Sequence, residues 1–121
     1  MPDWDVVEGI GLEAPSDLPA SERTKFDRGW ESLRKGRLET AVTDIESLAR
    51  RYESSPEVAT AAGFLDLRLG KPLDAERKFQ EALRKEPELG AAQSGYFLVA
   101  LQAGNEERAF ERLSRLEESF P

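Results

Sequence analysis

The residue types that carry most enzyme chemistry are scarce in this sequence of 121 residues. It contains no Cys and no His, so it lacks a thiolate nucleophile, a Cys-ligated zinc site and the imidazole that is the commonest general base and neutral metal ligand. Its charged side chains are 24 Asp and Glu against 17 Lys and Arg. The chemistry left to consider is that of clustered carboxylates.

The acidic pairs Glu106-Glu107 and Glu117-Glu118 are neighbours on a helix surface, where helix-start electrostatics and solubility explain them. Gly9-Ile10-Gly11 is too short for a phosphate loop and lacks the flanking strand and helix. Arg50-Arg51 is a lone basic pair rather than a nucleic-acid patch. We therefore expect a non-enzymatic protein without catalytic residues, cofactor or metal site.

The net charge of −7 argues against nucleic acid and anionic membranes as partners, because both bind basic surfaces. No window of 18 apolar residues occurs, so we expect no membrane insertion. Residues 1–10 lack the basic start and apolar core of an export signal. The location therefore stays open between the cytoplasm and, where an export signal has been removed, the periplasm.

The negative charge is concentrated at the N-terminus. Residues 1–22 hold six acids and no base, whereas residues 23–121 hold 18 acids and 17 bases. Pro and Gly interrupt any helical period in this segment, and apolar residues are spaced between them: Trp4, Val6, Val7, Ile10, Leu12 and Leu18. We predict an extended acidic arm over residues 1–21, with a disordered tail as the alternative.

The rest of the chain repeats with a period of 34 residues, which is the signature of a helical repeat array. The recurring positions are Gly29 and Gly63; Gly36, Gly70 and Gly104; Ala41, Ala75 and Ala109; Ile45, Phe79 and Leu113; Leu48, Ala82 and Leu116; and Pro87 and Pro121. This pattern resembles the tetratricopeptide repeat (TPR) family. The resemblance implies an all-α fold, an α-α superhelix (TPR solenoid) of three helix-turn-helix repeats at 22–55, 56–89 and 90–121.

Residues at the repeat boundaries support this division. Gly36 and Gly70 fall where the residue after a helix needs a left-handed backbone. Ser55-Pro56-Glu57 has the order of a helix cap, a first-turn proline and a first-turn acid. Pro87 ends the second helix of its repeat. The first repeat lacks this proline, so we expect its second helix to continue through Tyr52 toward the serine cap.

Two positions depart from the family pattern. Phe97 stands where Gly63 supplies a small residue in the second repeat, so we expect it to force the third hairpin apart, with Gly95 taking over part of the small-residue role. Asp66 stands where the family buries a large side chain. We expect it to meet the Arg50-Arg51 pair or to be exposed, and we expect no catalytic role for it.

In the family, the first helix of each repeat lines a concave groove. The positions that match its groove contacts are Phe26, Trp30, Leu33, Arg34, Thr60, Phe64, Leu67, Arg68, Ser94, Leu98, Leu101 and Gln102. Seven of them are apolar, with arginine on the edge, which favours a groove for a hydrophobic or amphipathic peptide. The alternative is that these apolar residues are simply core.

One subtype of the family is excluded by its groove residues. Relatives that clamp a C-terminal carboxylate carry Lys, Asn and Arg there. The matching residues here are Phe26, Trp30, Ala61, Ala91 and Gly95. We therefore do not expect recognition of a carboxylate tail.

The predicted function is a protein-protein interaction scaffold whose acidic arm lies in its own groove, with Trp4, Val7 and Ile10 as anchors. Two alternatives remain. The chain could be an oligomerisation or assembly module of a longer repeat protein, of the bacterial envelope assembly type, which forms a homodimer or packs on neighbouring repeats through the last helix. The apolar residues of that helix are Phe110, Leu113, Leu116 and Phe120. A secretion chaperone is the other alternative.

Overall fold

The computed structural model describes residues 7–102, and this part contains five α-helices and no strand. The helices are α2 (Ala20–Arg34), α3 (Leu38–Arg51), α4 (Pro56–Arg68), α5 (Pro72–Lys85) and α6 (Gly90–Gln102). The all-α prediction is thus confirmed. The predictions for the second helix of the third repeat, including Gly104 and the apolar residues of the last helix, lie outside the described residues.

The 34-residue period of the sequence reappears in the helix boundaries. α3 and α5 begin and end 34 residues apart, and so do α4 and α6. α2 ends 34 residues before α4 but begins at Ala20, two residues earlier than the period gives. This early start follows from Pro19, whose carbonyl accepts hydrogen bonds from the backbone N–H groups of Glu22 and Arg23 at 3.0 Å each.

The turns within the two complete hairpins are also equivalent. Gly36 and Gly70 both have a left-handed backbone, with φ of 79° and 74°, as predicted. After α2, the Gly36 N–H donates to the Leu33 carbonyl at 3.2 Å and the Arg37 N–H donates to the Ser32 carbonyl at 2.8 Å. The corresponding bonds after α4 have the same lengths. This pair of bonds is a Schellman motif, which reverses the chain after a helix.

The connection between the hairpins confirms one prediction and corrects another. The Ser55 hydroxyl accepts a hydrogen bond from the Val58 N–H at 3.2 Å, and Pro56 is the first helical residue of α4. The second helix of the first hairpin does not continue through Tyr52, because that residue has φ −128° and ψ 53° and ends α3. The chain leaves the helix there so that Ser55 can cap α4.

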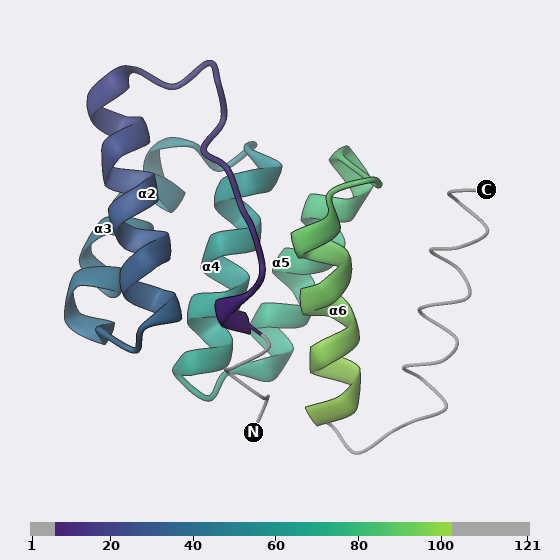
Figure 1. Cartoon of the computed structure of the whole chain (residues 1–121). Helices are drawn as coiled ribbons and strands as arrows, with labels where there is room; N and C mark the ends of the chain where they lie inside the picture. The colour runs from purple at the N-terminus through teal and green to yellow at the C-terminus, as the bar shows by residue number, and fades with distance from the viewer. Residues whose placement is uncertain (1–6, 103–121) are drawn as a thin grey trace.

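Each helix packs against the next one along the chain, and α4 also contacts α2 and α6. Figure 1 shows α2, α4 and α6 side by side, with α3 and α5 behind them. Phe79 of α5 joins the two layers. A Cβ atom added at Gly63 of α4 would lie 2.7 Å from the Phe79 ring, and one at Gly95 of α6 would lie closer still. Gly95 therefore has the small-residue role expected of it.

Charged side chains hold the helices together beside the apolar core. Arg28 of α2 donates two hydrogen bonds to the carboxylate of Asp44 in α3, at 2.7 and 2.8 Å. Asp66 in α4 is buried, and its partner is Lys78 of α5, whose Nζ lies 2.6 Å from Asp66 Oδ2. The expected contact with an arginine of α3 was wrong. The side chain of Asp66 meets the following helix instead of the preceding one.

Candidate functional site

The seven apolar residues of the predicted groove are mostly covered. Leu101 is 44% exposed, and the other six are buried: Phe26, Trp30, Leu33, Phe64, Leu67 and Leu98. The Trp30 and Phe64 rings meet edge to face with centroids 5.3 Å apart, and Phe64 meets Phe79 in the same way at 5.0 Å. This geometry stabilises aromatic pairs beyond the area they bury. The stripe is therefore continuous with the core between the helices.

The polar residues predicted for the groove have different surroundings. The Thr60 side chain is fully buried, and its hydroxyl donates to the Pro56 carbonyl at 2.7 Å, so its hydrogen bond is made within α4. Ser94 is exposed on α6. Gln102 is the last residue of α6, and its side chain lies outside the described part.

Arg34 and Arg68, which occupy equivalent positions at the ends of α2 and α4, both bond to backbone carbonyls. Arg68 donates from Nε to the Leu33 carbonyl at 3.2 Å and from Nη2 to the Arg34 carbonyl at 2.9 Å, which caps the C-terminus of α2. Arg34 donates from Nη1 to the Glu8 carbonyl at 2.6 Å and also pairs with Glu31. The first arginine thus holds the N-terminal arm, and the second holds two helices together.

The described part of the arm, residues 7–19, lies against the layer formed by α2, α4 and α6. Figure 1 shows it crossing in front of α4, between α2 and α6. Val7 is fully buried and Leu12 is 8% exposed; both belong to the same apolar cluster as Phe26, Trp30 and Leu33. Ile10 is half-buried against that cluster. Trp4, the third predicted anchor, lies outside the described residues.

The arm runs antiparallel to α2. The Glu8 carbonyl meets Arg34 at the C-terminal end of α2. Further along, three arm residues share a surface cleft with the N-terminal half of the same helix. These residues are Leu12, Glu13 and Ala14 of the arm, and Ala20, Arg23, Thr24 and Asp27 of α2. The chain then reverses into α2 through the turn at residues 15–19, where the Leu18 N–H donates to the Pro15 carbonyl at 3.3 Å.

The charges along the arm meet different partners at its two ends. Burial lowers the pKa of the Arg68 guanidinium, and the negative charge of Glu8 opposes that shift. At the other end, burial raises the pKa of the Glu57 carboxyl in α4, and the nearby charges of Glu86 and Asp17 raise it further. The arm is therefore electrostatically favoured near the ends of α2 and α4 and opposed near the start of α4.

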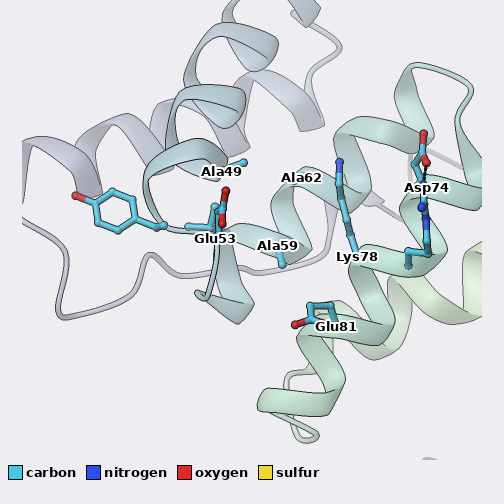
Figure 2. Close-up of a pocket in the computed structure, with 10 residues that line it drawn as sticks. Ala49, Glu53, Ala59, Ala62, Asp74, Lys78 and Glu81 are labelled. Atoms are coloured by element: carbon cyan, nitrogen blue, oxygen red, sulfur yellow. Dashed lines mark hydrogen bonds and ion pairs between the residues drawn. The ribbon is translucent and has the colours of Figure 1, made fainter.

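A second hollow, which the sequence analysis did not identify, lies between α3, α4 and α5. It has a volume of about 560 Å³, and its floor includes Ala49, Val58, Ala59 and Ala62. Figure 2 shows its charged rim, where Lys78 and Glu81 come from α5 and Glu53 follows α3. The alanines at helix-facing positions were the only signal in the sequence. Two rim cations are engaged, since Lys78 pairs with Asp66 and Arg77 pairs with Asp74.

Among residues 7–102, no group of three or more acidic side chains is arranged so that it could hold a metal ion. Within the same range, no helix is both long and apolar enough to cross a membrane. Comparison of the chain with protein-family models, with curated proteins and with solved structures gives no match. The functional argument therefore depends on the geometry of the chain itself.

Proposed function

We propose that this chain is a non-enzymatic protein-protein interaction module of the TPR type, which binds a peptide segment on the face formed by α2, α4 and α6. The repeat assignment is supported by the 34-residue spacing of helix ends and by the two equivalent Schellman turns. The packing of α4 against both α2 and α6 also supports it, since stacked repeats contact only their neighbours.

The observation that carries the binding proposal is the docked arm. A stretch of acidic polypeptide without a regular helix of its own lies on this face, with Val7 fully buried and the Glu8 backbone held by Arg34. A surface that takes apolar side chains and bonds to a main-chain carbonyl has the features needed for a peptide ligand, because apolar burial supplies affinity and polar groups fix the position. The arm then regulates access to the face.

The test uses the full chain with Val7→Asp, which places a charge in the apolar cluster and should release the arm. Circular dichroism first establishes that the helices persist. The variant should then bind an apolar dye and a panel of amphipathic peptides more strongly than the wild type. Leu73→Asp is the matched control, because Leu73 is 75% exposed and lies far along the chain in α5. A folded Val7→Asp chain that binds no more dye or peptide than the control contradicts the proposal.

A further inference from the structure

The docked arm has features that define the chemistry of a partner. Building on the proposed function, we propose that the ligand of this face is an acidic protein segment with apolar side chains at positions i, i+3 and i+5 and a carboxylate at i+1. It would bind in the orientation of the arm, antiparallel to α2. The arm, with Val7, Glu8, Ile10 and Leu12 at these positions, is a weaker copy of that segment in cis.

The apolar spacing follows from the backbone of the arm. Val7 and Glu8 form a single helical turn that is closed by the Ile10 N–H donating to the Val7 carbonyl at 3.0 Å. Residues i and i+3 of such a turn share one side, which explains why Val7 and Ile10 both face the apolar cluster. The chain is extended after Ile10, so side chains alternate and Leu12 returns to the same side. A ligand with another spacing would leave one apolar side chain exposed.

The preference for an acidic segment follows from the two arginines. Arg34 bonds to a main-chain carbonyl, so it fixes the position of a ligand of any sequence. Arg68 interacts favourably with the charge of Glu8 while its guanidinium is held against the end of α2. Because Arg68 is partly buried, the attraction is screened less by salt than one between exposed groups. Arg68 therefore reads the charge of the residue at i+1.

The far end of the arm explains how a partner could displace it. Asp17 lies near enough to Glu57 for the two negative charges to repel each other. A ligand with a neutral or basic residue at this position would avoid the repulsion and keep every other contact. The arm also gains from being tethered, since its effective concentration at the face is high. A partner in trans must overcome that advantage, and removal of the repulsion is the means that the structure offers.

The experiment measures binding of synthetic peptides to the full chain carrying Val7→Asp. One peptide has the sequence of residues 3–18, and the second replaces all of its Asp and Glu by Asn and Gln. We expect the acidic peptide to bind about fivefold to tenfold more tightly at low salt, and the difference to shrink at high salt, because ionic screening weakens the attraction. A peptide with Glu8→Gln alone should lose most of the difference, whereas one with Asp17→Asn should bind more tightly than the parent.

The outcomes separate this inference from the proposed function. Equal binding of the acidic and the amide peptide overturns the charge preference but leaves peptide binding in place. If neither peptide binds to a folded chain, the proposed function fails too. Should Val7→Asp not fold, Leu12→Asp replaces it, since Leu12 is less completely covered. Light scattering tests the other occupant, the arm of a second copy; a wild-type dimer that Val7→Asp converts to a monomer overturns the cis arrangement.

The arginines give a further readout that a purely structural role would not change. In the arm-released chain, Arg34→Gln should weaken both peptides by the same factor, because Arg34 bonds to a carbonyl that both possess. Arg68→Gln should instead remove the preference between them. Equal effects of the two substitutions on the acidic and amide peptides contradict the assignment of charge recognition to Arg68.

Discussion

Truncation of Val7 tests whether the arm is a reversible occupant or a permanent part of the core. Val7→Ala removes two methyl groups from a fully buried site. At about 0.8 kcal/mol for each buried carbon, the docked arm should lose about 1.6 kcal/mol, and a residual cavity would add to this. Since about 1.4 kcal/mol corresponds to a factor of ten, the population of the released arm should rise about 15-fold.

Hydrogen exchange of the Ile10 amide provides the assay. This amide donates to the Val7 carbonyl, so it is protected only while the arm keeps its turn. The exchange rate of Ile10 should rise about 15-fold in Val7→Ala, while amides in the middle of α4 exchange at rates changed only by the loss of global stability. The matched control is Val58→Ala in α4, which removes the same two methyl groups from a site that is also buried.

The two variants distinguish local release from global unfolding. If the arm opens by itself, Val58→Ala leaves the exchange of the Ile10 amide unchanged, although it lowers the free energy of unfolding measured with urea. The opposite finding, in which both variants accelerate Ile10 and the α4 amides together, would refute the reasoning. The arm would then open only when the whole domain unfolds, and it could not regulate access to the face.

Three further predictions concern stability. Gly95→Ala should lower the free energy of unfolding by about 1–3 kcal/mol, because its Cβ would clash with the Phe79 ring, and Phe79→Leu should reduce this loss. Arg28→Ala should lower the melting temperature more than the double substitution with Asp44→Ala, since the single change leaves a buried carboxylate without its bidentate partner. Glu57 should make stability fall as pH rises, and Glu57→Gln should remove this decline.

The sign of the pH effect follows from the raised pKa of Glu57. Between the ordinary glutamate pKa and the raised value, the folded chain binds a proton that the unfolded chain has released. Stability contributed by this group is therefore present at low pH and is lost as pH rises through the folded pKa. Urea midpoints measured from about pH 4 to pH 7 check this, because Glu57→Gln should flatten that part of the profile. A steeper decline in the variant than in the wild type would contradict the assignment.

Controls for the other two predictions come from the same chain. Gly90→Ala should leave stability unchanged or raise it slightly, since a Cβ there meets no atom within 4 Å. Equal losses at Gly90 and Gly95 would show that the Phe79 ring does not decide the effect. For the ion pair, a double-mutant cycle with no coupling between Arg28 and Asp44 would contradict the structure.

The sequence by itself determined the helices and their boundaries, because the signals are local. A left-handed glycine ends each first helix, and the Ser55 cap starts the next one whatever packs around them. The recurrence of these signals every 34 residues also predicted which helices form hairpins. The prediction for Tyr52 was wrong because the absence of a proline does not extend a helix when the following residues are needed to cap another.

Tertiary structure alone decided which side chains meet. Asp66 was correctly identified as unusual, but only the packing of α4 on α5 shows that Lys78 neutralises it. The apolar stripe could be read as core or as groove, because periodicity gives the face of a helix and not what covers it. The burial of Val7 and its place in the same cluster as Trp30 depend on contacts between residues far apart in the chain. Such contacts arise from shape and charge complementarity, which no local pattern in the sequence encodes.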